Sequence, residues 1–392
     1  MSQKVLLLLA SWVLAAQGCK KLDPVSADQA AAIRFGPWLL DVGSSQVTVA
    51  WHSLGDTAGK VSYGEAELDR SAVEQQARSE HRVLISGLQA DRRYRYRVEG
   101  PAPREGSFWT APDPAAQVPF KVLVYGDNRT DELAHASVVK AAVKEGARLA
   151  LHTGDMVQDA KKAEQWLSWF TVEQDLLRVT PLLATVGNHE LGDKGVAYSA
   201  HFQSLGHAPY RSLDFGPVHV VVLDAFELAP GAKTPRVGSI GWAQRAWLAQ
   251  DLAAVPKDRH VWLLTHQGPF SHAAPKAKKF HGGSENVKEA LLPFKDRIQA
   301  VFAGHDHYYQ RGEEEGLRYF VVGGGGAPLY DPDDKAPGVK AAKKSHSYLA
   351  LDVCGCHVTG TVKDPAGQVL DSFTLASCPT ACPAVPAQAA QR

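Results

Sequence analysis

VFAGHDHYYQR, residues 301–311, places two histidines around an aspartate directly after an apolar run and a glycine. The same pattern, an apolar run that stops at Asp, Asn or His, recurs in KVLVYGDNR, RLALHTGDMVQ, LLATVGNHE and VWLLTHQGPF. Short apolar runs of this kind are typical of buried strands. The pattern therefore predicts a sheet whose strands end in polar, titratable side chains.

The segments between these runs have the periodicity of helices. Examples are ELAHASVVKAAVKEG, AEQWLSWFTVEQDLL and SIGWAQRAWLAQDLAAV, the last with Ser239 as its expected N-cap. Strands that alternate with helices indicate an α/β domain. We place this domain at residues 118–377, and we expect a mixed sheet because segments 210–226 and 347–375 have the pattern of hairpins.

A different pattern precedes that domain, between residues 30 and 112. Short alternating runs such as QVTVAW, HRVLISGL and YRYRVEG are separated there by Gly, Asp and Ser. In YRYRVEG, Tyr94, Tyr96 and Val98 share one face, which is the two-residue period of a half-buried strand. These runs predict an all-β sandwich, and the proline-rich stretch 111–119 predicts a linker.

Length and charge restrict the class of protein. The chain has 392 residues, of which 45% are hydrophobic, and this is enough for two globular domains. Lys plus Arg and Asp plus Glu both number 42, and no basic stripe stands out. This charge balance argues against nucleic acid as a main partner.

The first 19 residues, MSQKVLLLLASWVLAAQGC, have the layout of an export signal: an early lysine, an apolar stretch, and small residues before Cys19. The apolar stretch is too short to span a membrane. Cys19 is placed like the acylated cysteine of a bacterial lipoprotein. We expect an exported protein held on the membrane, facing the periplasm or the cell exterior, by a lipid on Cys19; cleavage and release is the alternative.

Four further cysteines lie near the C-terminus: Cys354, Cys356, Cys378 and Cys382. An even set in an exported chain predicts one or two disulfides, with three full pairings open. A zinc site is the weaker alternative, because the spacing is not that of a zinc finger. Residues 378–392, rich in Ala and Pro, are predicted to form a disordered tail.

Loops at the carboxyl ends of strands in an α/β sheet converge on one crevice. We therefore expect the polar residues after the five apolar runs to meet around one ligand. Their carboxylate, amide and imidazole donors suit Zn, Fe or Mn. Six donors exceed one tetrahedral site, so two metal ions that share a carboxylate are expected. The six residues are Asp127, Asp155, Asn188, His266, His305 and His307.

The motifs GD, GDMVQD, GNHE, THQGPF and GHDH follow one another between residues 126 and 307. In this order they resemble the five motifs of the calcineurin-like metallophosphoesterases. The stretch LISGLQADRRYRYRV in the expected sandwich resembles the end of a fibronectin type III domain. This sandwich, together with GHDHYYQR, is similar to the purple acid phosphatase branch. The resemblance implies a four-layer α/β/β/α catalytic domain preceded by a fibronectin type III-like sandwich.

The resemblance also implies a role for each donor. One metal would be held by Asp127 and His307, the other by Asn188, His266 and His305, with Asp155 as the bridge. His189 and Asp155 are the residues assigned to catalysis, and His189 would stabilise or protonate the leaving oxygen. Four residues are expected to contact the substrate phosphate: Arg129, Asn188, His272 and His281.

Two residues depart from the family pattern. Gln158 stands where purple members have a tyrosine, and Arg129 stands where other branches have a histidine. The first metal therefore lacks a familiar ligand, and Gln158, Asn128 or water is expected to take its place, without the colour of tyrosinate-bound iron. Arg129 is expected to form a two-pronged contact with a phosphate oxygen.

Residues beside the motifs are assigned supporting roles. Glu190 and Asp306 are expected to orient metal ligands through hydrogen bonds. The glycine-rich stretch VVGGGGAP, residues 321–328, lacks the lysine and the helix of a phosphate-binding P-loop. We expect it to form a tight turn at the edge of the crevice.

The implied function is hydrolysis of phosphomonoesters by attack of a metal-bound hydroxide, as in acid phosphatases. Metal binding lowers the pKa of water from about 15.7 toward about 7, so hydroxide is present at working pH. A phosphodiesterase with the same metals is the nearest alternative, since selectivity depends on the walls around the second ester arm. A non-catalytic surface lipoprotein that binds through its sandwich is the alternative from another class.

Overall fold

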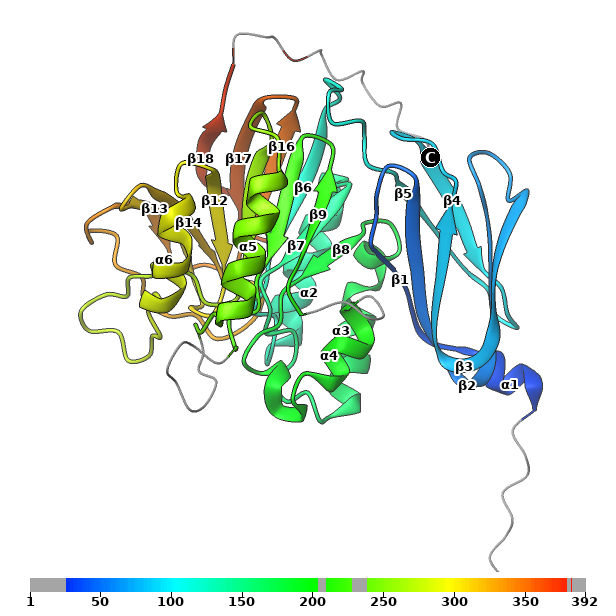
Figure 1. The fold of residues 1–392 in the computed structure, drawn as a ribbon. Coiled ribbons are helices and arrows are strands. Elements are labelled where there is room, and N and C mark those ends of the chain that lie inside the picture. The colour runs from blue at the N-terminus through cyan, green and yellow to red at the C-terminus, as the bar shows by residue number, and fades with distance from the viewer. Residues whose placement is uncertain (1–25, 204–208, 228–237, 379–381, 383–392) are drawn as a thin grey trace, which may run out of the picture.

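The computed structural model describes residues 26–203, 209–227, 238–378 and residue 382. The expected export signal and Cys19 lie outside the described residues, as does most of the expected tail. Within them, a small all-β region precedes a larger part in which sheets and helices are layered (Figure 1). No helix among the described residues has both the length and the apolar character needed to cross a membrane.

The N-terminal region is built around one long strand. A short helix, α1 (Ala27–Ala31), comes first, and β2 then pairs with β1 and β3 along its first half and with β3 and β4 along its second. In β4, Tyr94, Tyr96 and Val98 are buried, as the alternation predicted. The strands are β1 (Ile33–Leu40), β2 (Gln46–Gly64), β3 (Arg70–Ser86), β4 (Arg93–Val98) and β5 (Arg104–Trp109).

Two further sheets form the centre of the larger part. The first has the order β18-β17-β16-β6-β7-β8, with β6, β7 and β8 parallel. Its strands are β6 (Phe120–Tyr125), β7 (Leu149–His152), β8 (Leu182–Ala184), β16 (Tyr348–Cys354), β17 (His357–Lys363) and β18 (Val369–Ala376). The mixed character of this sheet follows from the antiparallel strands β16–β18, which the sequence predicted as hairpins.

The second sheet has the order β15-β13-β14-β12-β11-β10-β9. The strands β10, β11, β12 and β14 run parallel, while β9, β13 and β15 are antiparallel to their neighbours. Its strands are β9 (Arg211–Phe215), β10 (Val218–Val222), β11 (His260–Leu264), β12 (Ile298–Ala303), β13 (Tyr309–Glu314), β14 (Leu317–Val322) and β15 (Val339–Lys343).

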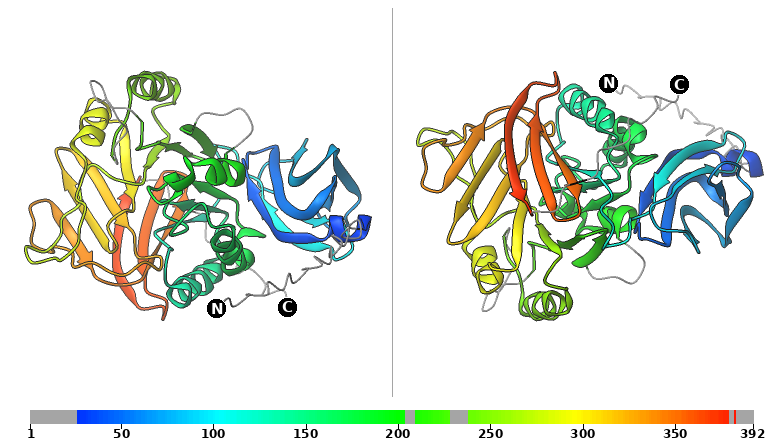
Figure 2. Two further views of the ribbon diagram at one scale, coloured as in Figure 1. Left: turned by 90° about the horizontal axis from the view of Figure 1, so that it is seen from below. Right: turned by 90° about the horizontal axis from the view of Figure 1, so that it is seen from above.

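The two sheets pack face to face, and helices cover their outer faces. Alternate residues of β6 show the layering, because Val122 and Val124 belong to the core between the sheets while Leu123 and Tyr125 pack under the helices. The first sheet is covered by α2 (Glu132–Ala142) and α3 (Ala163–Leu177), and the second by α5 (Trp242–Ala254) and α6 (Glu285–Leu291). The predicted four-layer α/β/β/α arrangement is therefore confirmed (Figures 1 and 2).

Helix predictions were accurate except at one end. The helix α3 spans the predicted segment 163–177, whereas α5 begins at Trp242 with Gly241 as its N-cap. The prediction of Ser239 as that cap is wrong. The Ser239 backbone N–H donates to the Ala225 carbonyl at 2.8 Å, and Ser239 forms an isolated β-bridge with Phe226. The chain is therefore extended at this position.

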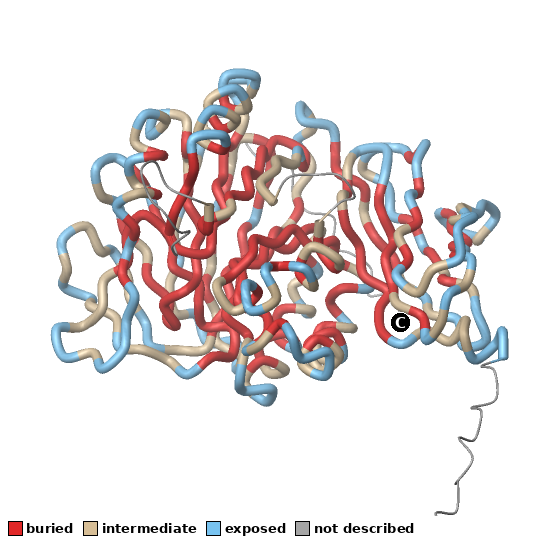
Figure 3. Tube along the Cα trace, turned by 60° about the horizontal axis from the view of Figure 1, so that its bottom comes forward, coloured by how far each residue is buried: buried red, intermediate tan, exposed pale blue. Residues whose placement is uncertain are grey.

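The N-terminal sheet packs on α3 and on α4 (Val196–Phe202). The Trp38 indole N–H donates to the His201 carbonyl at 3.0 Å, and the Tyr96 hydroxyl donates to the Arg178 carbonyl at 3.0 Å. Phe35 stacks on Phe170, with ring centroids 4.6 Å apart. Buried residues are therefore found in both parts of the molecule, including where the two parts are in contact (Figure 3).

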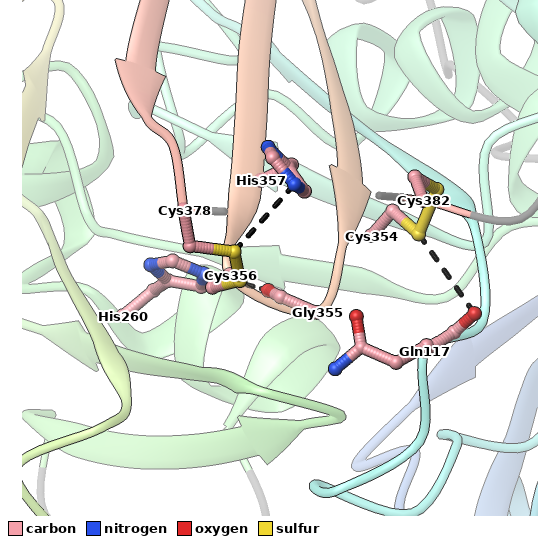
Figure 4. Close-up of a disulfide and its surroundings, with 8 residues drawn as sticks. All are labelled: Gln117, His260, Cys354, Gly355, Cys356, His357, Cys378 and Cys382. Carbon is pink, nitrogen blue, oxygen red and sulfur yellow. Dashed lines mark hydrogen bonds between the residues drawn. A yellow bond between two sulfur atoms is a disulfide. The ribbon is translucent and has the colours of Figure 1, made fainter. Parts of the chain in front are cut away.

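The four late cysteines form two disulfides, Cys354–Cys382 and Cys356–Cys378 (Figure 4). These bonds connect the β16–β17 hairpin to the segment after β18. Cys356, His357 and Cys378 offer ligand atoms within 4.8 Å of one another. Both sulfurs of that group are already joined to each other, so they are not available as zinc thiolates.

His219 on β10 gives a prediction about pH. Burial lowers its pKa, but hydrogen bonds to Asp214 and Asp251, at 2.8 and 2.9 Å, outweigh burial and raise the pKa to about 9. A raised folded-state pKa means that the charged pairs stabilise the fold fully below about pH 6.5, and that this stabilisation is lost as the pH rises through about 9.

We expect His219→Gln to lower the free energy of unfolding by about 1–2 kcal/mol near pH 6, allowing for the solvent exposure of Asp214, and by much less near pH 10. Urea unfolding at both pH values measures the difference. An equal loss at the two pH values would contradict the charged state of this histidine.

Candidate metal centre

The predicted donors follow strands of both sheets. Three of them come after β6, β7 and β8 of the first sheet, and three come after β11 and β12 of the second. The structure brings the two groups together where the carboxyl ends of these strands meet. The six residues are Asp127, Asp155, Asn188, His266, His305 and His307.

Four donors surround what we call the second position. The Nε2 of His266 lies 3.0 Å from Asn188 Oδ1, 3.1 Å from His305 Nδ1 and 3.5 Å from Asp155 Oδ1. The Nδ1 of His266 donates to the Thr153 carbonyl at 2.8 Å, which leaves a lone pair on Nε2. His266 Nε2 and Asn188 Oδ1 therefore have at most one ring proton between them, on His305 Nδ1, and a cation suits the lone pairs that remain.

What we call the first position involves Asp127, His307 and the same Asp155. Ligand atoms of Asp127 and Asp155 lie within 4.8 Å of each other and of His266 of the second position, and Asp127 Oδ1 is 3.7 Å from His307 Nε2. The Nδ1 of His307 donates to the Pro328 carbonyl at 2.8 Å, so its Nε2 also presents a lone pair. Asp155 faces both positions, which is the geometry of a bridging carboxylate.

The Arg129 guanidinium lies among the donors of the first position. Its Nε donates to Asp155 Oδ2 at 3.0 Å, its Nη2 to His307 Nε2 at 3.1 Å, and its Nη1 to Gln158 Oε1 at 3.0 Å. The sequence placed Arg129 against the substrate, whereas the structure places it on two metal donors and on Gln158.

Burial sets the charge of these groups. Burial and the neighbouring Asp155 raise the pKa of Asp127 well above its usual value. Burial lowers the pKa of His266 and of His305, and it lowers that of His307 to about 3. The three imidazoles are therefore neutral at ordinary pH, the form that binds metal. Zn, Fe and Mn suit this set of oxygen and nitrogen donors.

Three donor residues have a backbone conformation that side chains disfavour. The φ angles of Asp127, Asp155 and His305 are 56°, 56° and 70°. Left-handed backbone at a non-glycine residue costs on the order of 1 kcal/mol or more and concentrates at functional sites. Its occurrence at three of the six donors supports a ligand site rather than ordinary strand ends.

The glycine-rich loop packs against the backbone that carries Asp127. The Gly325 N–H donates to the Gly126 carbonyl at 2.9 Å, and a Cβ at Gly325 would overlap that carbonyl. A Cβ at Gly304 would overlap the Asp127 carboxylate. Glycine is required at both positions because of close approach, and the loop is a turn at the edge of the crevice, as expected.

Glu190 holds two of the donor loops together. Its carboxylate accepts from the N–H groups of Gly187, Asp155 and Met156 at 2.7, 2.9 and 2.9 Å. Burial and the charge of Asp155 raise the pKa of Glu190 to about 8. The expectation that Glu190 supports the ligands through hydrogen bonds agrees with these contacts.

Asp306 supports the loop that follows β11. Its carboxylate accepts from the N–H of His281 at 2.7 Å, from the N–H of Gly282 at 3.0 Å, and from the Ser271 hydroxyl at 2.6 Å. The imidazole of His281 packs on His305, with ring centroids 4.1 Å apart. His281 therefore lies beside the second position.

His189 reaches the same centre. Its Nδ1 donates to the Gln158 carbonyl at 2.7 Å, which leaves Nε2 as the atom 3.9 Å from Asp155 Oδ2. Its backbone N–H donates to Asp155 Oδ1 at 3.0 Å. The imidazole is 19% exposed, so it is open to a substrate.

His272, expected from the sequence to contact the substrate, has its described hydrogen-bond partners on β13. Its Nε2 lies 2.6 Å from Glu314 Oε1, and its backbone N–H donates to Gln310 at 2.9 Å. These partners on β13 fix the imidazole beside Tyr319, at 6.2 Å between ring centroids. The orientation of the His272 imidazole is therefore set by Glu314, which lies far from it in the sequence.

A buried polar layer under the centre was missed by the sequence analysis. Asn128, which follows Asp127, bonds to His152 on β7. Glu173 on α3 accepts from Tyr125 at 2.9 Å and pairs with His135 at 2.8 Å. The available signals were a histidine at the end of the apolar run LALH and a glutamate on the apolar face of α3.

Residues 120–309 match the family model of the calcineurin-like phosphoesterases. A phosphoenolpyruvate phosphatase from Allium cepa is 25% identical over 278 residues, which are 66% of this chain and 55% of that protein. Purple acid phosphatase 21 from Arabidopsis thaliana is 27% identical over 270 residues, which are 63% of this chain and 58% of that protein. The chain thus spans just over half the length of these two relatives.

A solved structure shares the fold. The purple acid phosphatase PPD1 from yellow lupin (Lupinus luteus) seeds superimposes with a TM-score of 0.71 at 18% sequence identity, over 89% of this chain and 77% of that one. The N-terminal all-β region and the layered part are both included in such coverage. Residues 120–309 are thus similar to the calcineurin-like phosphoesterases, and the proteins that resemble this chain in sequence and in fold include purple acid phosphatases.

Proposed function

We propose that this protein is a metal-dependent phosphatase that hydrolyses phosphomonoesters. The observation that carries the proposal is the meeting of six donors from two sheets. Their lone pairs face one another, and few protons are available to form hydrogen bonds between them. The names of the relatives, which are phosphatases, support the same reaction class. We assign the activity to residues 118–377 and a supporting role to the sandwich at residues 30–112.

Two metal ions drawn from Fe, Zn and Mn fit the donor set. Asp127 and His307 would hold one ion at the first position, and Asn188, His266 and His305 the other at the second position, with Asp155 shared. Bound there, the ions would attract the phosphate oxygens and supply hydroxide at working pH. The residues of the chain fix the positions of these donors, and their neutral imidazoles need no deprotonation before binding.

The remaining residues would bind and position the ester. His189 presents Nε2 beside Asp155. With Nδ1–H held by the Gln158 carbonyl, the doubly protonated ring can donate a proton from Nε2 to the leaving oxygen. His281 is exposed beside His305, where its ring can donate to a phosphate oxygen. Asn188 offers its amide NH₂ to the substrate while its carbonyl oxygen faces His266.

Hydrolysis of an aryl phosphate tests the proposal directly. We expect turnover in the metal-loaded protein, its loss after full chelation, and its return on adding Zn²⁺, Mn²⁺ or Fe. Activity that survives complete metal removal would refute a metal-dependent reaction. A bis-aryl phosphate assayed in parallel separates the two ester classes, and faster hydrolysis of the diester would replace phosphomonoesterase by phosphodiesterase.

Metal content separates an enzyme from a non-catalytic binding protein. We expect more than one metal ion per chain after purification in metal-replete medium. Fewer than about one ion per chain, together with no turnover of either ester, would favour a surface lipoprotein whose sandwich does the binding.

Replacing His189 gives a prediction with a matched control. We expect His189→Ala to lower kcat for an aryl phosphate by about 10²-fold, because a positioned general acid contributes roughly 10²–10⁴ to the rate. Metal content should stay within error, since the imidazole is not among the six donors. His272→Ala, which removes a histidine paired with Glu314, should keep most of the activity. Equal effects of the two replacements would contradict the role given to His189.

We further propose that the protein is exported and carries a lipid on Cys19. The support is the signal-like composition of residues 1–19. Mass spectrometry of the mature N-terminal peptide distinguishes an acylated Cys19 from a free, cleaved end. Cys19→Ser should release the protein from the membrane fraction, and an unchanged distribution would overturn the lipid anchor.

A further inference from the structure

Arg129 makes the two metal positions unequal. In the second position the Nε2 of His266 lies at contact distance from both Asn188 and His305. In the first position a cation is already present, because the guanidinium donates to Asp155 and His307. The Arg129 side chain is only 11% exposed, so these charge-assisted contacts are largely shielded from solvent.

A metal ion and the guanidinium cannot share His307. The single lone pair on His307 Nε2 can accept one Arg129 N–H or bind one metal at about 2.0–2.1 Å, but not both. The Oδ2 of Asp155, which accepts from Arg129 Nε, has a second lone pair, so the exclusion depends on His307. Two cations within a few ångströms of each other also repel. Occupation of the first position therefore requires Arg129 to leave it.

The structure contains a place for the displaced side chain. A cavity of about 300 Å³ lies beside the first position and is lined by Arg129 and Glu132, with Gln165 and Ser168 among its other walls. Glu132 is exposed and accepts from the Ser168 hydroxyl, which leaves carboxylate lone pairs for a guanidinium. Because the Glu132 carboxylate belongs to the same cavity, the charge of Arg129 would remain paired after the movement.

We propose that Arg129 is a built-in competitor of the metal ion at the first position. With Arg129 on Asp155 and His307, the chain binds one ion tightly at the second position. A second ion enters only as the guanidinium turns toward Glu132, so its affinity is set by that exchange. The inference rests on the metal centre described under the proposed function. It adds the order in which the two metal ions bind and names Arg129 as the residue that controls binding of the second ion. Arg129 acts here as a positioning residue.

Metal binding to the apo protein tests this without any assay of activity. Chelated protein is titrated with Mn²⁺ and followed by calorimetry, elemental analysis and the electron paramagnetic resonance of Mn²⁺. We expect two binding steps in the wild type, the first giving the spectrum of an isolated ion and the second giving the broadened spectrum of a coupled pair. The second step should be weaker by about tenfold or more, the equivalent of one lost charge-assisted contact.

Three variants distinguish the competitor from a passive neighbour. Arg129→Met should strengthen the second step by about tenfold while leaving the first unchanged. Glu132→Gln removes the alternative partner of the guanidinium and should weaken the second step. Lys161→Ala, which removes an exposed cation from the loop that follows Asp155, should change neither step. Arg129→Lys keeps the positive charge but lacks the two-pronged guanidinium. Its affinity for the second ion should lie between those of the wild type and of Arg129→Met.

The failure of this inference is distinguishable from failure of the metal centre. Unchanged second-step affinity in Arg129→Met, with two ions still bound, would overturn the competitor and keep the centre. No binding of Mn²⁺ or Zn²⁺ by the wild type would overturn both. Apo Arg129→Met is also expected to melt at a lower temperature than the apo wild type, because Asp155 loses its buried partner. A melting temperature that is unchanged in the apo variant would count against the contacts on which the inference depends.

Discussion

Asp155→Asn is expected to reduce kcat/KM for an aryl phosphate by about 10³-fold or more and to reduce the bound metal to one ion per chain or less. Asp155 faces both positions: its Oδ1 lies 3.5 Å from His266 Nε2, and its Oδ2 accepts from Arg129 at 3.0 Å. The amide is nearly isosteric with the carboxylate but carries no charge, so it cannot offset two cations.

The measurement is kinetics together with elemental analysis on the same preparation. Asp352→Asn is the matched control, because Asp352 is exposed and pairs only with Lys121 among the contacts described for it. It should leave activity and metal content unchanged. Retention of two ions and of activity within tenfold in Asp155→Asn would rule out a bridging role for this carboxylate.

Glu190→Ala is expected to lower the free energy of unfolding by about 3–5 kcal/mol. The Glu190 carboxylate is fully buried and accepts from the N–H groups of Gly187, Asp155 and Met156. Its removal leaves these buried donors without an acceptor and opens a cavity beside them. Because Asp155 and Asn188 belong to the loops that Glu190 joins, metal affinity should fall as well.

Urea unfolding of the metal-free proteins measures this loss without a contribution from metal binding. Glu67→Ala, at an exposed position of the N-terminal region, is the control and should change stability by less than about 0.5 kcal/mol. Glu190→Gln keeps one acceptor oxygen and should lie between the two. A loss of under 1 kcal/mol in Glu190→Ala would mean that water or another group replaces the carboxylate.

Much of the fold could be predicted because local pattern and tertiary environment agree. The helix α3 follows from its apolar spacing, and the burial of Tyr94 and Tyr96 follows from strict alternation. The N-cap of α5 could not be predicted, because Ser239 is drawn into a bridge with Phe226 from a distant part of the chain. The pairing of the cysteines likewise depends on how β16, β17 and β18 align, which spacing alone does not fix.

Within each sheet, the meeting of the donors was predictable from the endings of parallel strands, since those ends share an edge. The stacking of the two sheets, which brings the two groups of donors together, was implied by the family resemblance. The directions of the neighbouring side chains were not predictable. Arg129 is oriented by His307 and His272 by Glu314, and both partners lie far away in sequence. Similarly, the burial of Glu173 could not be explained from the sequence, because its partner Tyr125 is brought to it only when α3 packs on the sheet.

The docking of the N-terminal sheet on α3 and α4 limits how the protein can be divided. Trp38 and Tyr96 bond to carbonyls at the ends of these helices, and Phe35 covers Phe170. Excision of the N-terminal sheet would remove the aromatic contact of Phe35 from α3, the helix that carries Glu173. Fragments for expression or for fusion to other modules should therefore retain both parts, because the layered part is not expected to fold unchanged without this sheet.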